Sequence, residues 1–445
     1  MLETPKRPSL LGSSRLGIGL TQGILLLFLH QAVSAEQWPA TDKALFTPLL
    51  TSALFVPVIA IAGIGNLRTR TLVLWLAAAF VICVGVGWYQ IFRQMPVPLG
   101  RRLGPYGFWF KFGGFLIVFF FVLHTLVAAA DADRRWIASA ATYFYATWKL
   151  ATQVAFASLF VVLVYCALVM GRALFRLIDV DSLVTGMDMD FLWIPLATLV
   201  TSLAFHLIDR RFAVMLGTIK LLLGLISSFL FIIAPLIVIF LITLPFTGLA
   251  ALWSSGHATP QLIFASAVLI ALINSHFQTG ESEAGQLKAL VYVRYAAAFL
   301  LIPLFTLAAT DSGLQVERHG WTPDLIVTVA CLVVLACQTL GYALVAIRSG
   351  LSLRGLTIVN AWAAIVAVVA SLALLSPIAD PSRLFVAYQL KRLETGAVQP
   401  ASFDYLKLRT QGAGYGWVAL EHLKTTREGP HASDIARGAA TALNN

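Results

Sequence analysis

Charged residues are scarce in this sequence. Asp, Glu, Lys and Arg together make up only 12% of its 445 residues, whereas hydrophobic residues make up 59%. A water-soluble chain cannot bury that much apolar surface, so the composition excludes a soluble globular protein and indicates an integral membrane protein. The formal net charge of +10 reflects how Lys and Arg are distributed along a membrane protein, and it does not predict a nucleic-acid partner.

The motifs of common enzymes are also missing. The sequence contains no GxxxxGK[ST] phosphate-binding loop, no GxSxG, no HExxH and no CxxC. Its four cysteines all fall in hydrophobic runs, which favours buried apolar residues over a disulfide or a zinc site. We therefore expect no cofactor, and none of these standard motifs indicates an enzyme.

Eleven hydrophobic runs are long enough to cross a bilayer. A membrane-spanning helix needs about 20 mostly apolar residues, and continuous rather than alternating runs favour helices over barrel strands. The predicted spans are Leu16–Ala35, Ala44–Ile64, Thr71–Ile91, Tyr106–Ala130, Leu150–Met170, Phe191–Ile208, Leu221–Phe246, Leu262–Gln278, Val291–Thr310, Leu325–Ile347 and Gly355–Ser376. The sequence thus predicts an all-α integral membrane protein, with a polytopic helical bundle over 16–376 and a basic N-terminus at 1–15. In the first run, Gly19 and Gly23 form a GxxxG pattern that predicts the close approach of another helix.

The C-terminal part is far more polar. Residues 377–426 hold three short helical signals, which begin at Asp380-Pro381-Ser382, at Pro400-Ala401-Ser402 and near Trp417. Helices this short are not stable alone, so we expect them to pack on each other or on a membrane face. The composition of residues 427–445 predicts disorder.

The distribution of Lys and Arg predicts the orientation. If the N-terminus is cytoplasmic, the cytoplasmic ends and loops carry 15 Lys and Arg, and the opposite loops carry eight. Positive charge is enriched on the cytoplasmic side, so the N-terminus is expected inside and the tail outside. Because Val33-Ser34-Ala35 resembles a signal-peptidase site, a cleaved signal is the alternative to a retained first helix.

Two of the spans end with the same pattern, an acid, two arginines and an aromatic residue. These endings are Asp133-Arg134-Arg135-Trp136 and Asp209-Arg210-Arg211-Phe212. Arginines at a cytoplasmic helix end bind anionic lipid and oppose the helix dipole. One interpretation is therefore interfacial anchoring, in which each aspartate pairs with its neighbouring arginines.

Histidines near these endings support a second interpretation. His124 lies about two helical turns before Asp131, and His206 lies about one turn before Asp209. Ionisable groups inside a membrane are costly and are candidates for function. This interpretation is a polar vestibule or proton path on the cytoplasmic side, formed by His124, Asp131, Asp133, Arg134, Arg135, His206, Asp209, Arg210, Arg211, Asn274 and His276. A metal ion is not favoured, because the histidines lack a local metal-binding spacing.

Several short stretches carry a family resemblance. They are Trp38-Pro39-Ala40-Thr41-Asp42, Asp131 to Trp136 with Tyr143-Phe144 and Trp148-Lys149, Pro245 to Leu249, Gly320 to Pro323, and Arg392 to Gly396 with Phe403-Asp404-Tyr405. Taken together, they resemble the bacterial inner-membrane proteins grouped as Domain of Unknown Function 4153. The resemblance implies a multi-pass helical membrane domain in a bacterial inner membrane and a molecular activity that is not assigned.

Three functions follow as hypotheses. The first is solute or ion transport along the polar cluster. The second is a structural or regulatory envelope protein, in which residues 377–426 bind a periplasmic or membrane protein partner. The third is a membrane enzyme on a lipid-linked substrate, with phosphate held by Arg101, Arg102, Lys111 and Arg318 and with Glu317 or His319 as acid or base. Membrane lipids are expected partners in each case.

Overall fold

The chain is helical along nearly all of the part that the structure describes. The computed structural model describes residues 8–93, 105–178, 189–254, 256–275, 288–353, 355–425 and 431–444, and these residues contain no β-strand. Eleven of its helical segments are long and apolar enough to cross a membrane. The predicted all-α multi-pass architecture is confirmed.

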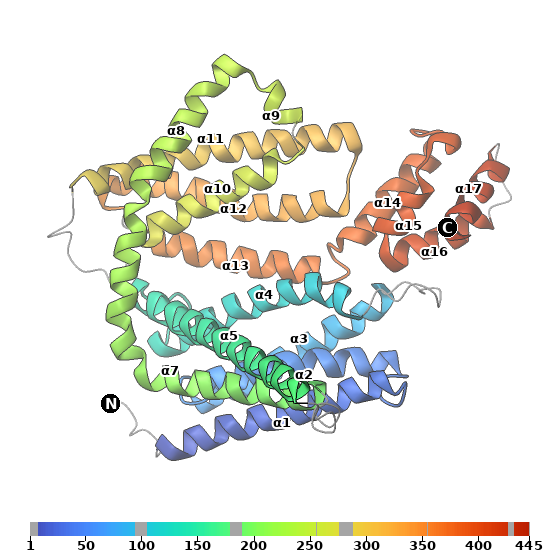
Figure 1. Cartoon of the computed structure of the whole chain (residues 1–445). Helices are drawn as coiled ribbons and strands as arrows, with labels where there is room; N and C mark the ends of the chain where they lie inside the picture. Colours follow the sequence, from blue (N-terminus) through green and yellow to red (C-terminus); the bar gives the residue numbers. More distant parts are fainter. Residues whose placement is uncertain are drawn as a thin grey trace. The chain divides into compact units, whose positions relative to one another are not determined.

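In the membrane-spanning part, the described residues form twelve helices, shown in Figure 1. They are α1 (Pro8–Ser34), α2 (Lys43–Gly63), α3 (Thr69–Arg93), α4 (Pro105–Asp133), α5 (Ala140–Leu177), α7 (Met189–Ser228), α8 (Leu230–Thr247), the short α9 (Ala250–Ser254), α10 (Ala258–Ser275), α11 (Lys288–His319), α12 (Pro323–Ser349) and α13 (Leu356–Leu374). Each of the eleven predicted spans corresponds to one of the eleven candidate segments.

Several helices extend further than the sequence pattern predicts, and two of them, α1 and α7, bear on the site. Helix α1 begins at Pro8, so Arg15, which was assigned to the basic N-terminus, lies inside a helix. Helix α7 continues without a break through Arg210 and Arg211 to Ser228, where a cytoplasmic loop was expected. No proline or glycine pair interrupts this stretch, so the backbone keeps its helical hydrogen bonds across the charged segment.

The chain divides into two compact units. The first consists of residues 1–91 and 124–219, and the second consists of residues 92–123 and 220–445. In the first unit, a Cβ atom added at Gly19 would lie 2.9 Å from the Thr198 carbonyl oxygen of α7, and one at Gly23 would collide with Pro195 of α7. The predicted close approach at the GxxxG pattern is therefore confirmed, and α7 is the partner helix.

The second unit has an apolar core. Helices α10, α11, α12 and α13 form one group in Figure 1, and each contacts the next along the chain. Leu269, Ile273, Ala297, Leu301 and Tyr342 are fully buried between them. Alanines on α11 allow the neighbouring helices to approach closely, as is usual for packing in membranes.

The tail folds as a packed group of four helices, α14 (Pro381–Glu394), α15 (Tyr405–Gln411), α16 (Ala413–Lys424) and α17 (Ala432–Asn444). The Asp380 carboxylate accepts hydrogen bonds from the backbone N–H groups of Ser382 and Arg383 and so begins α14. The first three helices match the predicted signals. The predicted disorder of residues 427–445 is wrong for Ala432–Asn444, because Ala439, Ala442 and Leu443 complete the apolar core of the tail.

Candidate functional site

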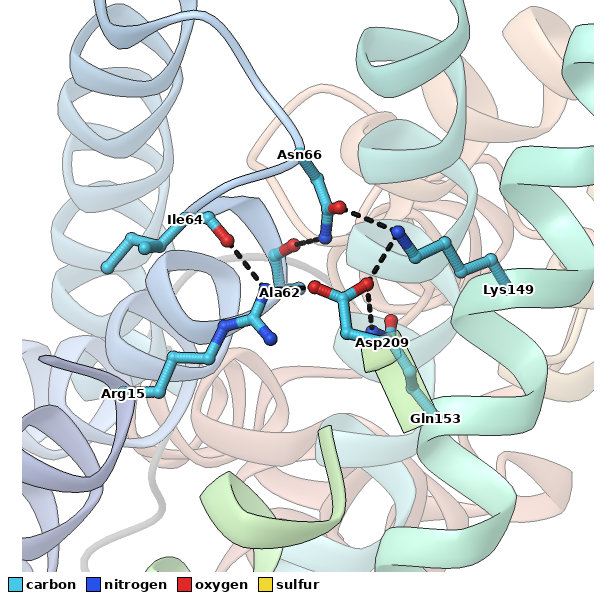
Figure 2. Close-up of polar contacts among 7 residues, drawn as sticks. All are labelled: Arg15, Ala62, Ile64, Asn66, Lys149, Gln153 and Asp209. Carbon is cyan, nitrogen blue, oxygen red and sulfur yellow. Dashed lines mark hydrogen bonds and ion pairs between the residues drawn. The ribbon is translucent and has the colours of Figure 1, made fainter. Parts of the chain in front are cut away.

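The aspartate of the second Asp-Arg-Arg ending lies at the centre of a buried polar network in the first unit (Figure 2). Asp209 Oδ2 accepts a hydrogen bond from Arg15 Nη2 of α1 at 2.5 Å. Its Oδ1 lies 2.5 Å from Lys149 Nζ of α5 and 3.5 Å from the Gln153 amide nitrogen one turn further along. One carboxylate of α7 thus joins side chains from two other helices.

The loop after α2 completes the same network. Arg15 Nη2 also donates to the Ile64 carbonyl oxygen at 2.6 Å, and Lys149 Nζ donates to Asn66 Oδ1 at 2.6 Å. The Asn66 amide group in turn donates to the Ala62 carbonyl oxygen at 2.7 Å. Both cations therefore have a neutral acceptor in addition to Asp209, as Figure 2 shows.

Burial makes this network electrostatically sensitive. The Arg15 side chain is 2% exposed, and those of Lys149 and Asp209 are each 16% exposed. Two cations share one carboxylate, so the group carries a net positive charge in a region where unpaired charge is costly. Among the described residues, Arg15 Nε has no hydrogen-bond partner. Asp209 therefore has one cationic partner on each of two other helices.

The neighbours of Asp209 in the sequence do not pair with it as the anchoring interpretation predicts. Arg210 and Arg211 are exposed, whereas the contacts of Asp209 are with Arg15, Lys149 and Gln153. His206 lies one turn earlier, packed against α1: a Cβ atom added at Gly12 would be 2.9 Å from His206 Nε2. The predicted pairing with adjacent arginines is thus wrong for Asp209. The carboxylate of Asp209 faces the inside of the unit, whereas the side chains of Arg210 and Arg211 are exposed.

The first Asp-Arg-Arg ending has a different role. Asp133 accepts hydrogen bonds from the Ser139 backbone N–H at 2.6 Å and from the Thr142 hydroxyl at 2.7 Å, and it therefore holds the beginning of α5. Arg134 and Arg135 are exposed. Asp133 shapes the turn between α4 and α5, so its hydrogen bonds do not depend on the arginines beside it.

Asp131 and His124 are buried and have hydrogen-bond partners on α3 or just before it. Asp131 is 8% exposed and accepts from the Arg68 backbone N–H at 2.9 Å, from Arg68 Nε at 2.7 Å and from the Thr71 hydroxyl at 2.5 Å. His124 Nδ1 accepts from Trp75 Nε1 at 3.1 Å. Because Nδ1 is the acceptor, a neutral His124 carries its proton on Nε2.

Asn274 belongs to a separate neutral network in the second unit. Its amide group donates to the Tyr342 hydroxyl at 2.6 Å, that hydroxyl donates to Asn360 Oδ1 at 2.9 Å, and Asn360 Nδ2 donates back to Asn274 Oδ1 at 2.8 Å. The three hydrogen bonds form a closed ring between α10, α12 and α13. His276 lies outside the described residues.

The predicted polar residues therefore have several distinct sets of partners. Sequence reasoning missed Arg15, Lys149 and Gln153 as partners of Asp209, and it missed Trp75 and Tyr342. Their signal was weak: each is a single polar or amphipathic residue in or beside an apolar run. No group of three or more His, Cys, Asp or Glu side chains able to hold a metal ion occurs among the described residues.

The residues proposed to hold a lipid phosphate are only partly described. Arg101 and Arg102 lie outside the described residues, and Arg318 Nη1 donates to the Trp253 carbonyl oxygen at 3.4 Å. The comparisons add no further assignment: no family model, curated protein or solved structure matches this chain. The resemblance of the sequence to a family therefore stays a prediction.

Proposed function

We propose that the protein moves a small solute or an ion across a membrane and that the network around Asp209 closes the path on one side. The observation that carries this proposal is a single buried carboxylate shared by cations from two different helices, Arg15 of α1 and Lys149 of α5. Ionisable groups that face the interior of a membrane bundle commonly mark substrate or ion paths.

The shared carboxylate has the properties that a gate requires. A gate needs two arrangements of similar free energy, so that a modest difference in ligand binding can shift the population between them. When α1 moves away with Arg15, Asp209 keeps Lys149, and when α5 moves away with Lys149, Asp209 keeps Arg15. Neither movement leaves the carboxylate uncompensated, and this lowers the cost of opening compared with a simple ion pair.

We further propose that the membrane is a bacterial inner membrane, with the N-terminus in the cytoplasm and the tail in the periplasm. The excess of Lys and Arg at the ends and loops on the N-terminal side supports this orientation. Arg15, Asn66 and Lys149 all come from segments that this orientation places near the cytoplasmic surface. The gate is then the cytoplasmic one.

A conductance measurement tests the proposal without knowledge of the substrate. The full chain is reconstituted into planar bilayers, and the conductance to K⁺, Na⁺ and Cl⁻ is compared between the unmodified chain and an Arg15→Gln/Asp209→Asn double variant. The double variant removes the charges of α1 and α7 together, leaves Lys149 of α5 with Asn66 as its acceptor, and removes the contact that closes the path. We expect a higher conductance for the double variant.

The control for this experiment is Asp324→Asn, which changes an exposed aspartate in the first turn of α12. We expect its conductance to equal that of the unmodified chain. A double variant that conducts no better than Asp324→Asn, although it is folded and inserted, would contradict the proposed gate.

The tail supports a second candidate function, that of an envelope protein with a docked partner. Its four helices share an apolar core, and Ile326 of α12 packs against that core, so the tail is a folded module fixed to a membrane helix. If this module binds a partner, deletion of residues 379–445 should remove specific proteins from the set cross-linked to the full chain in cells. An unchanged set would exclude this candidate.

A further inference from the structure

An apolar groove lies where the tail meets the beginning of α12. It encloses a cavity of about 400 Å³, lined by Trp321, Ile326, Val329, Leu384 and Tyr388. All five side chains are partly exposed, so the groove is open to its surroundings. Sites that hold one small ligand typically have volumes of about 300–1,000 Å³.

The groove lies at the level where a membrane helix begins. Ile326 and Val329 belong to the first two turns of α12, and the candidate span that contains them starts at Pro323. The opposite wall is α14, which belongs to the polar tail and contacts α12 (Figure 1). Beside the first turns of a membrane-spanning helix, such a groove would have the acyl chains of the bilayer on one side and water on the other.

Positive charge follows directly after the apolar wall on α14. Leu384, Tyr388 and Arg392 are spaced by four residues and so share one face of the helix. The guanidinium carbon of Arg392 lies 5.7 Å from the centroid of the Tyr388 ring, which places a cation at one end of the groove. The exposed Lys391 adjoins the same face. Asp324 on α12 is the one exposed acid in the first turn of the opposite wall.

A glycine fixes the position of this cation. Gly320 has a φ of +70°, and a Cβ atom added there would lie 2.9 Å from Tyr388 Cε1 and 3.4 Å from Arg392 Nη1. The turn before α12 therefore approaches Tyr388 and Arg392 so closely that a side chain would displace them. The charged end of the groove is held by packing, which lowers the entropy cost of binding an anion there.

We propose that the groove binds one acyl chain of an anionic phospholipid, with the lipid phosphate beside Arg392. An apolar slot that ends in fixed positive charge is complementary to a molecule with a hydrocarbon tail and an anionic head. The membrane supplies such molecules at high local concentration. The bound lipid would connect the tail to the bilayer surface, a role that does not depend on the proposed transport function.

Native mass spectrometry of the full chain tests this proposal. The protein is delipidated in detergent and titrated with phosphatidylglycerol or with phosphatidylcholine of the same acyl chains. We expect one tightly bound phosphatidylglycerol and weaker phosphatidylcholine binding. Val329→Trp fills the groove and should abolish the tight site, whereas Val333→Trp, at a 51% exposed position one turn further along α12, should keep it. Arg392→Gln should weaken phosphatidylglycerol binding about fivefold.

Further controls make each outcome decisive. Arg383→Gln removes an exposed cation from the other end of α14 and should leave the affinity unchanged. Protease protection of the tail in every variant shows whether the tail is still docked. Equal binding of both lipids, or an unchanged tight site in a folded Val329→Trp variant, would overturn the proposal. A dimer mass that disappears in Val329→Trp would also overturn it, because a second copy would then occupy the groove.

Discussion

The two Asp-Arg-Arg endings have the same local sequence and different roles in the structure. Asp133 is the last residue of α4 and accepts hydrogen bonds from the beginning of α5, and the aromatic residue of this ending, Trp136, is 97% exposed. Asp209 lies inside α7 and binds Arg15 and Lys149, and the aromatic residue of this ending, Phe212, is 1% exposed. The comparison shows that the contacts made by the rest of the chain decide whether such an ending anchors a helix or builds a buried site.

The largest expected difference concerns the two aspartates. Asp209→Asn leaves Arg15 buried without its carboxylate, and removal of one partner from a buried ion pair costs about 3–5 kcal/mol. Asp209→Asn also leaves Lys149 without its carboxylate, so the Arg15→Gln/Asp209→Asn double variant should be more stable than the Asp209→Asn variant because it removes one of the two uncompensated charges. Thermal unfolding in the same detergent measures both. A double variant that is less stable than the single variant would show that Arg15 is not destabilised by the loss of Asp209.

The second largest difference is expected between the aromatic residues of the two endings, in the stability that each contributes. Phe212 packs edge-on against Tyr145, with 5.0 Å between the ring centroids, so Phe212→Ala should leave a cavity and reduce stability by about 2 kcal/mol. This estimate lies below values for soluble cores, because a detergent or lipid environment weakens the hydrophobic contribution. Trp136→Ala at the other ending should change stability by less than about 0.5 kcal/mol. Equal effects would mean that the two endings are equivalent.

A smaller loss is expected at Asp133. Asp133→Ala removes the acceptor for the backbone N–H of Ser139, which is the N-cap of α5, and for the Thr142 hydroxyl, and the loss of these hydrogen bonds costs about 1 kcal/mol. Asp133→Asn keeps an oxygen acceptor and should recover most of that loss. Unfolding curves for the two variants test the capping role, and a loss as large as that of Asp209→Asn would contradict it.

The smallest effect concerns the tail and depends on pH. Burial, followed by the nearby Asp434 carboxylate, raises the pKa of Tyr405 above its usual value near 10. The folded tail therefore holds this proton where the unfolded chain loses it, so stability falls as the pH rises above about 10. Tyr405→Phe should remove that part of the fall, and circular dichroism of the full chain against pH should show it. An unchanged alkaline profile would contradict this account.

At neutral pH, Tyr405→Phe should not destabilise the tail. The Tyr405 hydroxyl is buried and has no hydrogen-bond partner among the described residues, so its removal relieves a desolvation cost of about 1 kcal/mol. A clear loss of stability at neutral pH would show that the hydroxyl has a partner in the folded protein.

Much of the fold could be predicted from the sequence. The eleven spans are legible because an uninterrupted apolar run of sufficient length has few alternatives in a membrane. The start of α14 at Asp380 and the close helix approach at the GxxxG pattern could also be predicted, because a few neighbouring residues encode each of them. The helix at Ala432–Asn444 was missed, because its three buried apolar residues are too few to oppose a polar composition until the rest of the tail is present.

The partners within the site could not be predicted. Asp209 and Arg15 are 194 residues apart, and Asn274 and Asn360 are 86 residues apart. Nothing in one sequence shows which polar residues of separate spans face each other, since this depends on how each helix is rotated. The sequence identifies most of the polar residues, but it does not show which of them pair with each other.

Thiol labelling tests the proposed gate most directly. In a cysteine-free background, Ser202→Cys places a reporter two helical turns from Asp209 on α7, and Ser266→Cys places a matched, equally buried reporter in the second unit. Both proteins are labelled in nanodiscs with a hydrophilic maleimide, with and without Arg15→Gln/Asp209→Asn. We expect the double variant to accelerate labelling at position 202 and to leave labelling at position 266 unchanged. Equal rates at position 202 with the network intact and removed would contradict the proposed gate.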